Sequence, residues 1–271
     1  MRMRMRLRLA SLVAALLLAS PAHAHDYWLE FQPLQPTVGA DLTLALWVGE
    51  DFVGETEKQF DKTRFSALRH VTSASNTDLL PTAIDGAVPI HHLKLAAPGG
   101  HLLAVERTPV RITLRARKFN HYLEHEGLHH VLAQRHAALE HLWPGHERYT
   151  RHLKAFVQIG EQADGVSTKV LGHRIEIVPD RDLALIKPGE RFGVVVLFDG
   201  KPLPGLQVEA FVRQGGTTRG QMATSDAAGR VQFTAQTSGA WLVRTLHMQR
   251  CSGCIGADWE SFWAGYSFAV R

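Results

Sequence analysis

Cysteine and long apolar runs are both scarce in this sequence. The 271-residue chain has two cysteines, Cys251 and Cys254, which excludes a small fold held together by several disulfides. The apolar run at residues 9–19 is shorter than the roughly 20 residues that a membrane-spanning helix requires. No later stretch is long and apolar enough to span a membrane. We therefore expect no membrane span after the amino-terminal segment.

Common signatures of catalysis are absent as well. The chain has no G-x-S-x-G motif, phosphate-binding loop or dinucleotide fingerprint. Residues 125–129 match the letters of the H-E-x-x-H zinc motif, but Gly127 interrupts the helical register that would place both histidines on one face. Neither sign of charge is in excess: of 30 Lys+Arg, four arginines lie in the first eight residues, which leaves 26 against 26 Asp+Glu. This balance gives no reason to expect nucleic acid or an anionic surface as a partner. The absence of these motifs does not by itself exclude an enzyme, but an enzyme is not the function we expect.

The first 24 residues have the pattern of a secretory signal peptide. Arginines at positions 2, 4, 6 and 8 precede the apolar run, and Ala22-His23-Ala24 matches an A-x-A cleavage site. We therefore predict a periplasmic protein whose mature chain starts at His25. Cleavage after Ala22 is the alternative, and it would leave His-Ala-His at the start.

Alternating apolar residues predict a mainly β protein. The period-2 pattern of a half-buried strand occurs at 42–48, 102–105 and 110–114. It returns at 175–177, 192–198, 206–212, 231–233, 241–243 and 262–270. Turn signals such as Asp199-Gly200 recur in this second set every ~8–12 residues, which is typical of an immunoglobulin-like sandwich.

A helical pattern separates the two sets of strands. Phe119, Tyr122 and Leu123 fall at helical spacing, and Gly127 predicts a break. A second helix can follow, lined by Leu128, Val131, Leu132, Leu139 and Leu142 and ended by Trp143-Pro144-Gly145. We predict two immunoglobulin-like β-sandwich domains, at 25–116 and 173–271, with a helical, histidine-rich insertion or bridge at 117–160.

The predicted amino terminus carries metal-binding chemistry. After cleavage at Ala24, the α-amine and the imidazole of His25 can chelate one ion together, and one donor from the fold would complete the site. After cleavage at Ala22, the amine, two backbone amides and the third-position imidazole can surround Cu(II) or Ni(II) in a plane. Nitrogen donors suit copper and nickel. The neighbouring residues 27–29 are Tyr, Trp and Leu, which would anchor this end in a core.

Two other groups are weaker metal-binding candidates. Eight of the 16 histidines cluster at positions 121, 125, 129, 130, 136, 141, 146 and 152, and His121 and His125 are i, i+4 neighbours on the predicted helix. Cys251 and Cys254 follow His247-Met248 closely. In an oxidising compartment we expect a small disulfide loop. The alternative is a soft-metal site for Cu(I) that includes the two thiolates.

Several segments together resemble a secreted bacterial family that is identified as the periplasmic component of a nickel or cobalt uptake system (NikM/NikK-like, a domain-of-unknown-function family). The resemblance extends over essentially the whole predicted mature chain. The segments that carry it are 24–30 (AHDYWLE), 48–52 (VGEDF), 54–55 (GE), 118–119 (KF), 122–123 (YL), 126–128 (EGL), 147–151 (ERYTR) with Lys154, 247–248 (HM) and 258–263 (DWESFW).

The resemblance implies a periplasmic β-sandwich protein that binds nickel or cobalt and supplies a membrane metal transporter. His25, His247, Asp258 and Glu260 lie in the matching segments and are the implied ligands, with His25 as the primary donor. The carboxylates would bind directly or orient another ligand. The second domain also resembles a carboxypeptidase-regulatory sandwich, a type that mediates contacts.

Two other classes of function remain open at this point. A copper-binding carrier, or a histidine-brace copper oxidase acting on polysaccharide, would also start with a histidine on a β-sandwich. Such an oxidase would need a flat, exposed aromatic face beside its copper. A metal-free interaction module would use the β domains to dock a partner and would not depend on His25.

Overall fold

The computed structural model describes residues 25–95 and 97–271. The predicted signal peptide and both candidate cleavage sites therefore lie outside the described residues. The described chain is mainly β with two α-helices, and its sheets form sandwich-like layers, which confirms the predicted fold class. No helix in this part of the chain is long and apolar enough to cross a membrane.

One large sheet runs through the molecule. Its strand order is β14-β13-β16-β17-β9-β7-β4-β5, and β8 pairs with the first part of β9. β17 and β9 are parallel, and the other neighbours are antiparallel. In chain order these strands are β4 (Phe65–Val71), β5 (Asn76–Asp78), β7 (Gly99–Arg107), β8 (Val110–Leu114), β9 (Gly145–Ile159), β13 (Gln207–Gln214), β14 (Thr217–Thr224), β16 (Gly239–Arg250) and β17 (Trp259–Val270).

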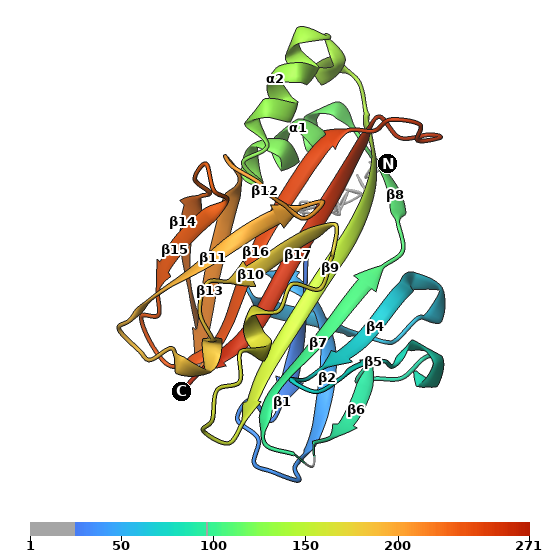
Figure 1. Ribbon diagram of the computed structural model, residues 1–271. Helices are drawn as coiled ribbons and strands as arrows, with labels where there is room; N and C mark the ends of the chain where they lie inside the picture. The colour runs from blue at the N-terminus through green and yellow to red at the C-terminus, as the bar shows by residue number, and fades with distance from the viewer. Residues whose placement is uncertain (1–24, 96) are drawn as a thin grey trace, which may run out of the picture.

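Two four-stranded sheets cover opposite faces of this large sheet (Figure 1). The first contains β1 (Asp26–Gln32), β2 (Asp41–Glu50), β3 (Val53–Lys58) and β6 (His91–Lys94). The second contains β10 (Ile175–Pro179), β11 (Arg191–Phe198), β12 (Lys201–Pro202) and β15 (Arg230–Thr234). Neighbouring residues of β9 separate the two cores: Ala155 and Val157 pack against the first small sheet, whereas Phe156 packs against the second.

The large sheet contains strands from both predicted domains. β9 and β17 make the connection, with Glu147 opposite Trp259 and Ala155 opposite Ser267. Each small sheet thus builds a sandwich with a different part of one shared sheet. Main-chain hydrogen bonds between β9 and β17 join the strands of the two predicted domains in this sheet. Whether each domain would fold independently stays a prediction.

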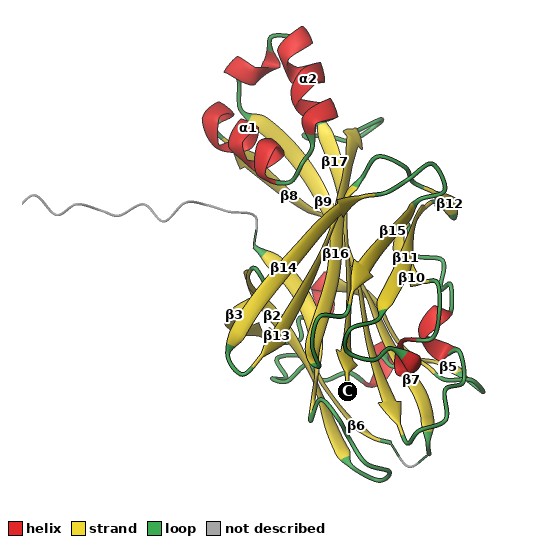
Figure 2. Ribbon diagram, turned by 90° about the vertical axis from the view of Figure 1, so that its left-hand side faces the viewer, coloured by secondary structure: helices red, strands yellow, loops and turns green. Residues whose placement is uncertain are grey.

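The two helices lie together at one end of the large sheet (Figure 2). They are α1 (Ala116–His125) and α2 (His129–Ala137). Phe119, Tyr122 and Leu123 are buried, as their spacing predicted, and Gly127 has φ +68° at the break between the helices. Their buried side chains join Leu246, Met248, Trp259 and Trp263 of β16 and β17 in one cluster.

The helical segment is shorter than the sequence predicted. α2 ends at Ala137, so the exposed Leu139 and Leu142 do not line it. Residues 145–159, which we assigned to the helical segment, form the strand β9. All residues of β9 from 151 to 159 are buried because cores cover both faces of the sheet. Residues 145–151 are mostly polar and show no alternation, whereas Leu153, Ala155, Val157 and Ile159 alternate with His152, Lys154 and Gln158.

Candidate functional site

The amino-terminal strand β1 is anchored along its length to the large sheet. The guanidinium of Arg151 donates to the carbonyl oxygen of His25 (Nη2–O 3.0 Å), and Ser267 donates to the carbonyl oxygen of Leu29. Arg213 binds both carboxylate oxygens of Glu30 at 2.6 Å. His25 therefore has a defined position rather than a frayed one.

A buried charge network holds the residue after His25. Arg244 lies between three carboxylates: its Nη1 is 3.1 Å from Asp26 and 2.8 Å from Glu126, and its Nη2 is 2.7 Å from Glu209. Burial raises the pKa of Asp26 to about 7, against the lowering effect of Arg244. The three carboxylates raise the pKa of Arg244 despite the opposing effect of burial. The guanidinium therefore stays charged and joins β1, β13, β16 and the end of α1.

His25 lies in the wall of a pocket of about 410 Å³ between β1, β3, α1 and the large sheet. Aromatic and charged side chains dominate the wall. The lining residues are His25, Tyr27, Val48, Glu55, Thr56, Lys58, Ile112, Tyr122, Glu147, Tyr149, Arg151 and Trp263. Nine of these twelve positions lie in segments that carry the family resemblance described above. Segments far apart in the chain thus converge on one pocket, which is hereafter called the terminal pocket.

A carboxylate lies next to the His25 ring. Nε2 of His25 is 3.1 Å from Oε2 of Glu55, and both side chains are partly exposed to solvent. An imidazole and a carboxylate this close can hydrogen-bond to each other, and together they can also bind one cation. Two side-chain donors, one nitrogen and one oxygen, therefore meet at the terminal pocket.

The inner wall of the terminal pocket contains a buried cation. The Arg151 guanidinium carbon is 4.2 Å from the ring centroid of Tyr27 and 4.8 Å from those of Tyr149 and Trp263. Contact with aromatic faces stabilises a desolvated guanidinium. Beyond its bond to His25, the Nε and Nη1 groups of Arg151 have no hydrogen-bond acceptor in the described chain.

Glu147 forms a second buried polar group of this wall. Its Oε1 accepts hydrogen bonds from the hydroxyl of Tyr122 (3.2 Å) and from Ser261, whereas Oε2 has no partner among the described residues. Burial raises the pKa of Glu147 to about 7, and the two hydrogen bonds oppose this shift. At neutral pH the carboxyl is therefore divided between its acidic and ionised forms.

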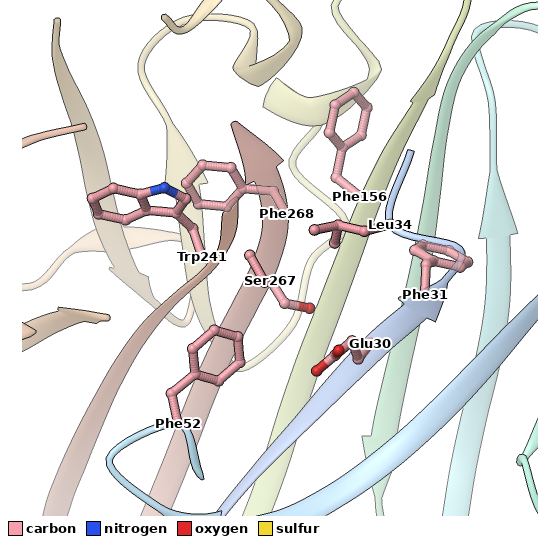
Figure 3. Close-up of a pocket in the computed structure, with 9 residues that line it drawn as sticks. Glu30, Phe31, Leu34, Phe52, Phe156, Trp241, Ser267 and Phe268 are labelled. Carbon is pink, nitrogen blue, oxygen red and sulfur yellow. The ribbon is translucent and has the colours of Figure 1, made fainter. Parts of the chain in front are cut away.

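A second cavity is too small to be a ligand site. It lies near the middle of the molecule, where Ser267 and Glu30 are surrounded by Phe31, Phe52, Phe156, Trp241 and Phe268 (Figure 3). Its volume is about 10 Å³, which is close to the space that one water molecule needs. The terminal pocket is the better candidate because its volume admits a small molecule.

The large sheet separates His25 from two of its predicted partners. Along β17, Glu260 and Phe262 point to one face, whereas Ser261 and Trp263 point to the other. Trp263 lines the terminal pocket. His247 is opposite Phe262 in the β16–β17 pair, so it shares the face of Glu260. Of the three residues predicted to join His25 in a metal site, Glu260 and His247 therefore lie on the opposite face of the sheet from it.

The carboxylate of Glu260 already has partners on its own face. Arg148 donates to Oε2 and Gln249 donates to Oε1, both at 2.8 Å. Burial favours its neutral form, but these contacts outweigh burial and lower the pKa of Glu260. The ring of His247 packs against Phe198, with ring centroids 4.6 Å apart. Burial and the nearby His130 lower the pKa of His247.

Asp258 and the cysteines lie at the β16–β17 connection. The main chains of Asp258 and Cys251 are hydrogen-bonded at 2.9 Å, and a disulfide joins Cys251 to Cys254. Within residues 25–95 and 97–271, Cys251, Cys254 and Glu260 form the one group of three metal-donor side chains whose ligand atoms lie within 4.8 Å of one another. Because the disulfide consumes both thiols, this group does not supply the thiolates that the Cu(I) alternative requires.

The histidine cluster is divided between several environments. His125 contacts Glu126 (3.3 Å), His130 donates to the carbonyl oxygen of Met248 (2.9 Å), and His146 hydrogen-bonds Thr113 (2.9 Å). His121 and His125 are i, i+4 neighbours on α1, as predicted. Neither belongs to a group of three potential metal-donor side chains in the part of the chain that the structure describes.

Sequence reasoning missed most of the terminal pocket. Five of its residues lie in segments that carry the family resemblance but were not predicted as site residues: Glu55, Tyr122, Glu147, Arg151 and Trp263. Successive side chains of a strand point to opposite faces, so the sequence of the predicted strand already indicates that Glu260 and Trp263 lie on different faces. It could not indicate which face of the strand His25 would meet.

Comparisons with known proteins agree with part of the sequence analysis. The model of the family described as a domain of unknown function (DUF4198) matches residues 22–249. A search of curated proteins found no match. Among solved structures, the FN1–FN3 domains of chicken CNTN1 are 9% identical with a TM-score of 0.22; the alignment covers 88% of this chain and 65%, less than two thirds, of that one.

Proposed function

The chain belongs to the DUF4198 family, and we propose that it is a periplasmic protein that binds a divalent transition-metal ion at His25 and supplies a membrane uptake system. His25 lies in the wall of the terminal pocket. Nickel or cobalt is the proposed cargo, and copper is the alternative. The observation that supports the proposal is the pairing of the His25 imidazole with the Glu55 carboxylate at 3.1 Å on an anchored strand.

The donor set fits such an ion chemically. Cleavage after Ala24 would add the α-amine of His25 to its imidazole, and Glu55 would supply one oxygen. Nitrogen and oxygen donors suit nickel, cobalt and copper, and the usual order of affinity favours copper when only the donors are considered. Nickel and cobalt are preferred here because of the family resemblance. Delivery to a membrane transporter is proposed on the same ground.

The shape of the terminal pocket favours a carrier over an oxidase of polysaccharides. Tyr27, Tyr149 and Trp263 direct their rings at Arg151 within the pocket. An enzyme that works on a polymer surface would need such rings on a flat, exposed face beside the metal. A concave site of about 410 Å³ suits a small cargo.

Adding one alanine before His25 is expected to lower the nickel affinity at least about 100-fold, because it converts the amine donor into an amide. Replacing Glu55 by glutamine should lower it about tenfold, which corresponds to about 1.4 kcal/mol. Isothermal titration calorimetry of the processed protein with nickel, cobalt and copper measures both effects.

Glu57→Gln is the matched control for Glu55→Gln. It removes the same charge from the same strand, but Glu57 does not line the terminal pocket. The control should bind nickel as the unmodified protein does. Nickel binding that is unchanged by the additional alanine would remove the His25 amine from the site and refute the proposal.

A further inference from the structure

The terminal pocket is much larger than a single ion requires. Its volume of about 410 Å³ lies within the range of about 300–1,000 Å³ that is typical of pockets for small organic ligands. His25 and Glu55 account for only two of its twelve lining residues. Four others are aromatic: Tyr27, Tyr122, Tyr149 and Trp263. Aromatic walls suit the carbon skeleton of an organic molecule better than the hydration shell of an ion.

Arg151 supplies hydrogen-bond donors that the protein does not use. The residue is 5% exposed and lines the terminal pocket, and its Nε and Nη1 groups have no acceptor among the described residues. Buried donors almost always have an acceptor, so unpaired ones in a pocket wall indicate an absent partner. A planar guanidinium matches the geometry of a carboxylate.

Lys58 adds a second cation to the same wall. It is the last residue of β3, and no acidic side chain of the described chain forms an ion pair with it. Glu55, two residues earlier, contacts His25. Lys58 thus brings to the wall of the terminal pocket a positive charge that no carboxylate of the described chain pairs with.

From these contacts we propose that the terminal pocket binds a small chelating carboxylate, an α-amino or α-hydroxy acid, whose carboxylate group is held by Arg151 and Lys58. The amine, hydroxyl or ring donors of the same molecule would face His25 and complete the coordination of the metal. The inference rests on the proposed function, and it defines the cargo as a complex of the metal with an organic acid rather than the hydrated ion.

Paired probes test the requirement for a carboxylate. L-Histidine represents the amino acids, citrate represents the hydroxy acids, and histamine is L-histidine without its carboxylate. In calorimetry on the processed protein with nickel present, L-histidine or citrate is expected to form a saturable ternary complex. If L-histidine is the one that binds, histamine should bind at least about tenfold more weakly.

Two variants test the residues. Lys58→Gln is expected to weaken binding of the carboxylate probe about tenfold, whereas Lys201→Gln, which removes an exposed lysine of β12, should have no effect. Arg151→Lys keeps the charge but removes the planar donor pair, and it should weaken the same probe. Circular dichroism shows whether Arg151→Lys is folded. If Arg151→Lys does not fold, Lys58→Gln still tests the proposal.

The outcomes separate this inference from the proposed function. Nickel that binds alone, with neither L-histidine nor citrate joining it, would overturn the carboxylate site and leave the metal site intact. If L-histidine or citrate binds in a way that depends on Lys58 but nickel does not bind at all, the carboxylate site is supported and the proposed function is refuted. Equal binding of histamine and L-histidine, with no binding of citrate, would also overturn the carboxylate site.

Discussion

Replacing Arg244 by methionine is expected to lower the free energy of unfolding by about 3–5 kcal/mol. Arg244 is buried and is the shared partner of Asp26, Glu126 and Glu209. Its removal leaves three carboxylates close together without a cation. Burying unpaired charge costs several kcal/mol, and methionine replaces only the aliphatic part of the contact. Urea denaturation of the two proteins at pH 7.5 measures the difference.

The charge network also allows a rescue experiment. Adding Glu126→Gln and Glu209→Gln to Arg244→Met should restore part of the lost stability, because it removes two of the uncompensated charges. Arg230→Met is the control, since Arg230 is exposed on β15 and its side chain makes no ion pair with the described residues. A loss below about 1 kcal/mol for Arg244→Met would show that the network is not the main anchor of β1.

The second large effect depends on pH. Relative to the unmodified protein, the His173→Gln variant is expected to gain about 2 kcal/mol of stability when the pH falls from 7.5 to 5. His173 is 2% exposed, and neither ring nitrogen has a hydrogen-bond partner among the described residues. Burial lowers its pKa to about 2, and the charges of Lys154 and Arg69 act in the same direction.

The sign follows from proton binding in the two states. Below pH 6.5 the unfolded chain protonates this histidine, whereas the folded protein keeps it neutral down to about pH 2. Stability is therefore lost as the pH falls from 6.5, and glutamine removes that loss. His152 is a second buried histidine, with its ring centroid 5.4 Å from that of His173. It stays in the variant together with the charged side chains around the two rings, which are Glu106, Lys154, Glu176, Arg69 and Arg174.

Glu147→Gln should behave in the opposite way. The folded pKa of Glu147 is about 7, so the folded protein binds a proton that the unfolded chain does not bind until about pH 4.5. The contribution of Glu147 to the free energy of unfolding therefore rises as the pH falls from 7 toward 4.5. Glutamine cannot take up this proton, so at pH 5 the variant should lack a stabilisation on the order of 2–3 kcal/mol that the unmodified protein has. His92→Gln, at an exposed position of β6, provides the baseline. Parallel stability curves for all variants between pH 7.5 and 5 would contradict both expectations.

Much of the secondary structure was predictable because it depends on local periodicity. The alternation that predicted β15 matches its burial, because Val231 and Phe233 are buried whereas Arg230 and Gln232 are exposed. The spacing of Phe119, Tyr122 and Leu123 likewise predicted α1. β9 was assigned to the helical segment, although Leu153, Ala155, Val157 and Ile159 alternate with His152, Lys154 and Gln158. The first part of the strand, residues 145–151, is mostly polar and has no alternation, so the local pattern does not show where the strand begins.

The sequence by itself determined the mainly β character, the helical interruption and a histidine at the predicted mature terminus, since each follows from the order of neighbouring residues. Only the tertiary structure decided which residues accompany that histidine. The parallel pairing of β9 with β17 and the crossing of β1 over one face bring Glu55, Arg151 and Trp263 to His25, while Glu260 and His247 face the other side. A strand shows which of its residues share a face, but the face that becomes a site depends on the elements packed against it.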